Sequence, residues 1–282
     1  MNLISFKIVA YITILLWLTG CFFLLFNHKI KNGNQIGKII TFSGILFIIA
    51  FVVFLWINLE RPPLRTIGET RLWYSVLLPL IGFFIFTKWN YKWLLYYSIS
   101  IAIIFLIINL ANPQNFDKNL MPALQSIWFV PHVIAYMIAY ALLGVCMAIA
   151  IWGLYLHKFK SFKYELLNKA DNLVLMGFSF LTIGLLLGAL WAKIAWGHYW
   201  SWDPKETWAL LTWLNFIFYL HFRFYHKQKI VIPLWTLIVG FILLMFCWIG
   251  INYLPVSKNS IHTYSFILIF TYLNSIKTKE KP

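Results

Sequence analysis

Six tryptophans gather in one short stretch of this sequence and indicate a site for a flat ligand. They lie within the 23 residues from 191 to 213, together with Tyr199. Their positions are Trp191, Trp196, Trp200, Trp202, Trp208 and Trp213. Tryptophan rings also anchor helices at the membrane–water boundary, but one or two rings suffice for that role. Because ring stacking and burial of apolar area reinforce each other, the cluster favours a large planar apolar ligand.

Asp203 and Glu206 lie inside this stretch and resemble an acid–base pair. Their spacing has a simpler local explanation, because Asp203, Pro204 and Glu206 occupy the N-cap, first and third positions of a helix start. We therefore predict that the two carboxylates cap a helix beginning at Pro204 and do not act as catalytic groups.

The remaining side chains able to bind metals or move protons are seven histidines and three cysteines. His28, His157 and His226 stand beside lysines at expected helix ends, where a solvated histidine is the simplest interpretation. The cysteines form no CxxC pair, which argues against a thiol–disulfide enzyme, a structural zinc site and covalent heme attachment to this chain.

The composition places these residues in a membrane protein. Hydrophobic residues make up 62% of the 282 positions, charged residues only 11%, and the mean hydropathy is +0.78. Soluble domains are roughly 45–50% apolar and about 25% charged. The net charge of +15 fits lysines at an anionic membrane face and not nucleic-acid binding. The apolar N-terminus lacks a basic leader and a small-residue cleavage site, so we expect it to be retained as a helix.

Apolar length and charged punctuation predict an all-α, polytopic membrane bundle of eight spanning helices with an external tryptophan-rich loop. The expected ranges are roughly 5–27, 37–59, 72–87, 92–111, 126–156, 171–196, 205–225 and 230–252. A ninth stretch, 263–276, is at the margin of the length needed to cross. We divide the chain into N-terminal helices (1–60) and a membrane domain (61–282) that holds the 191–213 segment.

Lysine and arginine counts predict the orientation. One set of helix ends carries twelve of them and the opposite set eight, before the basic tail. Since positive loops stay inside, the N-terminus and the tryptophan-rich segment are expected outside.

The segment WGHYWSWDPKETWALLTW resembles the tryptophan-rich WWD signature of heme-handling proteins of cytochrome c assembly. Three branches share this signature, CcsA, CcmC and CcmF, and the DPKETWAL continuation is similar to CcsA of System II. Three further segments are similar to that branch: Pro122–Ser126 followed by His132, Tyr219–Arg223, and Ile261–Tyr264. The flanking glycines of the last motif are replaced by Ser260 and Ser265. The similarity covers about residues 60–265, and the first two helices match in character only.

The resemblance implies roles for three histidines. His132 and His262 correspond to the two external axial ligands of heme iron, and both are expected at the outer membrane depth beside the tryptophans. His221 lies 17 residues into its helix, about 25 Å towards the inner face, and corresponds to a histidine thought to hold heme on its way in from the cytoplasm. His198 has a variable counterpart. The tryptophans expected to line the heme are Trp191, Trp196, Trp200, Trp202 and Trp208.

The CcsA resemblance also implies a function. Heme b would be held at the outer face and presented to the CxxCH segment of apocytochrome c, whose thiols form thioethers with the heme vinyl groups. The chain would form part of a holocytochrome c synthase with a CcsB/ResB-like membrane partner, and a separate thioredoxin-like protein would reduce the thiols. The expected location is the bacterial cytoplasmic membrane, or the thylakoid membrane if the gene is plastid-encoded, and the remaining partner is membrane lipid.

Two other functions stay open at this point. A CcmC-like presenter would load a heme chaperone without synthase activity, and assembly tests with and without such a chaperone separate the two. A b-type subunit that oxidises quinol would place histidine pairs within the bilayer, whereas His132 and His262 are both expected at the outer rim.

Overall fold

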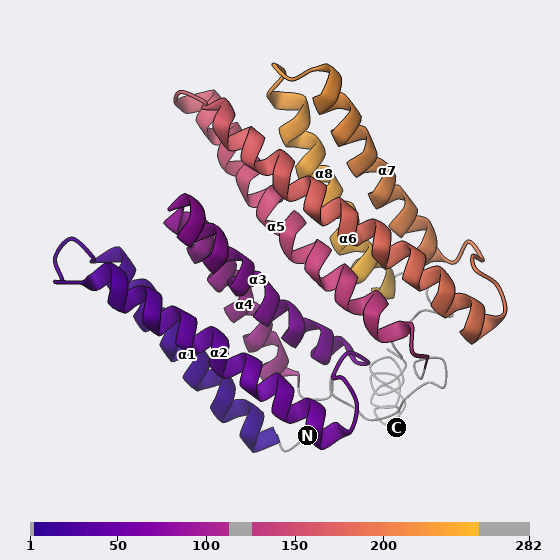
Figure 1. The fold of residues 1–282 in the computed structure, drawn as a ribbon, viewed down its shortest axis with the longest axis horizontal. Coiled ribbons are helices and arrows are strands. Elements are labelled where there is room, and N and C mark those ends of the chain that lie inside the picture. Colours follow the sequence, from indigo (N-terminus) through magenta and orange to yellow (C-terminus); the bar gives the residue numbers. More distant parts are fainter. Residues whose placement is uncertain (1–2, 113–125, 254–282) are drawn as a thin grey trace, which may run out of the picture.

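The computed structural model describes residues 3–112 and 126–253, and within these ranges its regular secondary structure is all helical (Figure 1). Eight long helices are followed by one short 3-10 helix. They are α1 Leu3–Leu25, α2 Gly33–Leu59, α3 Ile67–Trp89, α4 Lys92–Ala111, α5 Phe129–Phe159, α6 Tyr164–Trp196, α7 Pro204–Tyr225, α8 Val231–Trp248 and η3 Gly250–Tyr253. This confirms the predicted all-α bundle. The stretch 263–276 and His262 lie outside the described residues.

Seven of these eight helices are long and apolar enough to cross a membrane. The exception is α7, which has polar residues in its first turn and Arg223 in its last. In Figure 1, α7 lies next to α8, which is among the seven. The chain is therefore a polytopic helical membrane protein.

The helices run up and down, so that their connections fall at two opposite ends (Figure 1). The turns that join α1 to α2, α3 to α4, α5 to α6 and α7 to α8 share one end, which we call the turn end. The α2–α3 connection and the tryptophan-rich α6–α7 loop lie at the other, which we call the loop end. The start of α5, and with it His132, is also at the loop end.

Two helices begin earlier than the apolar pattern predicts, at Ile67 and Tyr164 instead of about 72 and 171. The α3 start is set by a capping box between Thr66 and Glu69, so this helix is 23 residues long and not short. In α6 the first turns carry Glu165 and Lys169, which the sequence analysis left outside the helix, since it placed the start at about residue 171. Polar side chains end an apolar run without ending a helix.

Buried side chains form two clusters. The larger is built from α3–α8, with its centre on the densely buried α5, and the smaller joins α1 and α2 to α3 and α4. Close packing of α5 on α6 depends on glycines. A Cβ on Gly177 would lie 2.9 Å from the Cγ and Cδ2 atoms of Leu143. The α5–α6 pair is thus a rigid support for the loop end.

Candidate functional site

The tryptophan-rich loop is defined by how α6 stops and α7 starts. Gly197 ends α6 with a φ of 87°, a left-handed conformation that glycine adopts readily. Asp203 then caps α7, since its carboxylate accepts a hydrogen bond from the backbone N–H of Lys205 at 2.9 Å. Glu206 accepts one from the backbone N–H of Asp203 at 3.1 Å. The predicted capping box is confirmed, and both carboxylates have a structural role.

His132 lies in the first turn of α5 and is held by α6. Its Nδ1 is 2.8 Å from the carbonyl oxygen of Gly184. A carbonyl oxygen only accepts, so Nδ1 carries the proton, and in the neutral ring the lone pair lies on Nε2. This second contact is the kind that orients a metal-binding imidazole and fixes its tautomer. The contact with α6 thus holds the His132 ring in one orientation and one tautomer.

A glycine on α6 allows this approach. A Cβ on Gly188 would lie 2.7 Å from both Cε1 and Nδ1 of the His132 ring, closer than packed atoms come. Gly184 and Gly188 are four residues apart, the small-xxx-small spacing that brings membrane helices together. That spacing was the available sequence signal for the partner of His132, and the sequence analysis missed it.

Aromatic rings surround this imidazole. The centroid of Trp191 lies 5.5 Å from that of His132, with the planes 36° apart. Trp191 is buried and contacts Phe129 at 5.0 Å and Trp196 at 4.9 Å. Below His132, Tyr136 meets the ring edge to face at 4.7 Å. The structure therefore brings Trp191 and Trp196 to the predicted axial histidine.

The other tryptophans of the segment lie in separate groups. Trp200 and Trp202 contact each other at 5.8 Å in the loop, where Trp202 is 67% exposed and has a φ of 60°. Trp208 packs on Phe246 of α8 at 4.3 Å, and Trp213 donates a hydrogen bond to the Thr182 hydroxyl at 2.9 Å. The segment thus combines a pair beside His132 of which Trp191 is buried, a pair in the loop of which Trp202 is exposed, and two helix contacts.

A small cavity lies beneath His132, between α5, α6, α7 and α8. Its lining includes Tyr136, Tyr140, Thr212 and Cys247, and its volume is about 10 Å³. That is about the space that one water molecule needs. This cavity is therefore too small to hold a planar macrocycle within the bundle.

His221 lies towards the turn end of α7 and is exposed. Its Nδ1 is 3.0 Å from the carbonyl oxygen of Ile217, one turn earlier on the same helix. It is thus far along the bundle from His132, and the structure does not bring the two together. Among the described residues, no group of three His, Cys, Asp or Glu side chains could hold a bare metal ion.

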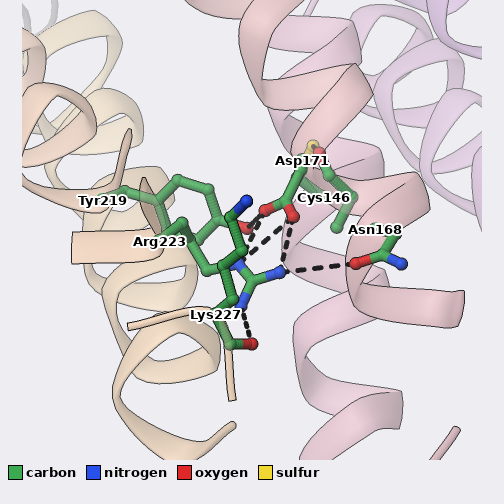
Figure 2. Close-up of polar contacts among 7 residues, drawn as sticks. Cys146, Asn168, Asp171, Tyr219, Arg223 and Lys227 are labelled. Atoms are coloured by element: carbon green, nitrogen blue, oxygen red, sulfur yellow. Dashed lines mark hydrogen bonds and ion pairs between the residues drawn. The ribbon is translucent and has the colours of Figure 1, made fainter. Parts of the chain in front are cut away.

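Close to His221, a buried polar cluster joins α6 and α7 (Figure 2). Arg223 donates from Nε to Oδ1 of Asp171 at 3.0 Å and from Nη2 to Oδ2 at 2.7 Å. The hydroxyl of Tyr219 donates to the same carboxylate at 2.6 Å. The sequence analysis missed this cluster, because it assigned Asp171 to a helix boundary and Arg223 to a loop. The sequence signal that could have revealed it is one acidic and one basic residue on two consecutive apolar helices, which would be expected to pair.

At the loop end, the basic residues beside α3 include Arg61, whose two Nη atoms lie 3.1 and 2.9 Å from the carboxylate of buried Glu69. Burial lowers the pKa of Arg65, the nearby Arg61 guanidinium lowers it further, and Glu69 opposes both. Because both of its Nη atoms bind the Glu69 carboxylate, Arg61 has a structural role in this ion pair.

Comparisons with known proteins agree with this geometry. The family model described as "Cytochrome C assembly protein" matches residues 6–257. Relatives named "Cytochrome c biogenesis protein CcsA" include one from Guillardia theta, 32% identical over 290 residues, which span 92% of this chain and 95% of the relative. Another, from Marchantia polymorpha, is 30% identical over 315 residues, covering 94% and 96%.

A solved structure, "Cytochrome c Heme Lyase CcmF", aligns with a TM-score of 0.66 over 88% of this chain. The alignment covers 46% of CcmF, so this chain spans about half of its length. With 16% sequence identity, the similarity is one of fold.

Proposed function

The chain belongs to the cytochrome c assembly protein family, in its CcsA branch, and from that premise we propose that it holds heme b at the loop end and presents it to apocytochrome c. The observation that carries the proposal is the hydrogen bond from His132 Nδ1 to the Gly184 carbonyl, which leaves Nε2 as the iron-binding atom. The partly buried ring lies among aromatic side chains, which suits a flat apolar group.

His132 and His262 would hold the heme iron between them. His262 lies outside the described residues, and its place rests on the family motif. Trp191 and Trp196, which contact each other beside His132, would line the near edge of the ligand, and the loop pair Trp200 and Trp202 would cover the side that faces solvent. Trp208 supports the base of the loop through Phe246.

When bound, heme supplies two vinyl groups, across which the two thiols of a CxxCH segment add to form thioethers. The chain contributes position. α5 and α6 fix the imidazole, the aromatic rings exclude water, and the loop end stays accessible to an extended peptide. No carboxylate of the loop is assigned a proton transfer, because Asp203 and Glu206 are used in the α7 cap.

His221 is proposed to hold heme transiently near the turn end, before it reaches the loop end. In this account the turn end faces the cytoplasm and the loop end faces outward, as the lysine and arginine bias predicts. The proposed partners are a CcsB/ResB-like membrane protein, with which the chain forms a synthase, and a thioredoxin-like thiol reductant.

The test is the absorption spectrum of the purified protein and of four histidine variants. Wild type is expected to carry low-spin heme b. His132→Ala and His262→Ala should each lose the low-spin bands or allow rapid oxidation, and His221→Ala should lower the amount of heme retained. His198→Ala is the matched control, because His198 is an exposed histidine in the same loop. Unaltered low-spin spectra in both outer variants would overturn the ligand assignment.

A further inference from the structure

The cluster of Asp171, Tyr219 and Arg223 has no role in the account so far, although it contains an ion pair inside the bundle (Figure 2). The side chain of Arg223 is 8% exposed and that of Asp171 26%. Removing two charges from water costs free energy that well-packed apolar side chains would not cost, so stability alone does not explain the pair. A charged pair instead adds geometric specificity, because its hydrogen bonds form only when the two helices have a particular relative orientation.

The cluster satisfies both charged groups. Asp171 receives four hydrogen bonds, three from Arg223 and one from Tyr219. Arg223 also donates from Nη1 to the Lys227 carbonyl at 2.6 Å and approaches the Asn168 amide oxygen at 3.5 Å. The guanidinium thereby fixes the last turn of α7, and the residues just after it, against the first turns of α6.

His221 lies midway between the two α7 members of this cluster. At about 100° per residue, Tyr219 and Arg223 are each about 200° from His221, in opposite senses around the helix. Both therefore lie on the face opposite to the imidazole. Consistent with this, Tyr219 and Arg223 are buried, whereas His221 is exposed.

The other directional contacts of α7 lie further from the turn end. The buried residues of α7 are Thr212, Phe216, Tyr219 and Arg223, a single stripe along the helix. Asn215 donates from Nδ2 to the Thr236 carbonyl of α8 at 3.1 Å, and Trp213 donates to the Thr182 hydroxyl of α6 at 2.9 Å. Both bonds lie about two turns or more before Arg223, so the cluster around Asp171 is the polar contact that holds the last turns of α7 on α6.

From this arrangement we infer that Asp171, Tyr219 and Arg223 are positioning residues, which set the rotation of α7 so that His221 faces outward and can receive heme. The inference rests on the proposed transient role of His221. The three residues do not touch the heme. They act through His221, and the exposed side of α7 is the surface from which heme reaches the imidazole.

The test has one arm that needs no heme. A spin label is placed at residue 221 or 220 of the full chain, with the three native cysteines replaced, and collision with oxygen is measured in lipid vesicles. Position 221 should be more accessible than 220. Asp171→Asn and Arg223→Lys should reduce that difference in accessibility. Trp213→Phe is the control: it also removes a hydrogen bond between α6 and α7, to Thr182, but ten residues before Arg223, so the difference at 221 should remain. An unchanged difference in the cluster variants overturns the inference.

The second arm titrates hemin into detergent-solubilised protein that retains His221. The His221-dependent low-spin component should weaken about 10-fold or more in the cluster variants, as for other residues that orient a ligand, and little in Trp213→Phe. Tyr219→Phe keeps the ion pair and should show a smaller loss, which provides a measurement if Asp171→Asn fails to fold.

The outcomes separate the two claims. If rotation changes but hemin binding does not, the cluster does not act through His221 and the inference fails. If His221→Ala itself leaves hemin binding unchanged, the proposed role of His221 fails, and the spin-label arm still decides whether the cluster sets the rotation.

Discussion

Replacing Gly188 by alanine should disturb the His132 imidazole more than it disturbs the fold. The added methyl carbon would lie 2.7 Å from Cε1 and from Nδ1, whereas relaxed carbon contacts are about 3.5–4.0 Å. The ring must therefore move by close to an ångström, and its 2.8 Å hydrogen bond to Gly184 is lost or lengthened.

Two magnitudes follow from this geometry. Overpacking of this kind costs about 1–3 kcal/mol of folding stability. Losing the contact that orients a metal ligand lowers affinity about 10–100-fold. Heme affinity in Gly188→Ala should therefore fall within that range, and the low-spin bands should weaken.

Gly177→Ala is the matched control. It adds the same methyl group to the same helix against α5, at 2.9 Å from Leu143, but far from any histidine. Both variants are assayed by thermal unfolding and by hemin titration of the purified protein. Similar losses of stability, with a heme defect only in Gly188→Ala, are expected. A heme affinity and spectrum equal to wild type in Gly188→Ala would refute the claim that α6 orients His132.

Three further predictions concern local structure. Asp203→Ala should lower stability by about 0.5–2 kcal/mol through loss of the α7 cap, whereas Asp203→Ser should keep both stability and cytochrome c assembly; loss of assembly in the serine variant, with an unchanged melting temperature, would indicate a catalytic carboxylate. Arg61→Ala should cost about 1–3 kcal/mol, because it removes the two guanidinium bonds of the buried Glu69 carboxylate, which keeps those from the backbone N–H groups of Arg65 and Thr66, and a denaturant melt that shows no change would contradict this. Trp213→Phe should cost about 1 kcal/mol for its hydrogen bond to Thr182 without altering the heme spectrum, and a spectral change would place Trp213 at the ligand.

The amino-acid sequence determines much of this fold in advance. Apolar runs of membrane length gave all eight helices, and the Asp203–Glu206 spacing gave the start of α7 to the residue. The missed boundaries at Ile67 and Tyr164 have one cause, which is that the first turns of these helices carry charged side chains. Hydropathy detects the apolar part of a helix, whereas the hydrogen-bonded helix also includes polar end turns.

Contacts between helices were less predictable. The sequence places His132 at the right end of the bundle, but not against Gly184, because that contact depends on the rotation of two helices about their axes. The same holds for Asp171 and Arg223, which are 52 residues apart in sequence. The tryptophans looked like one surface in the sequence, yet α6, the loop and α7 divide them into separate groups.

The account depends most on His132 as an iron ligand, and chemical rescue tests this directly. His132→Gly removes the imidazole and leaves space for a free one. The purified variant should lose the low-spin spectrum of wild type and regain it when imidazole is added, while His198→Gly should resemble wild type throughout. A His132→Gly protein that keeps the wild-type low-spin spectrum without imidazole would contradict the account.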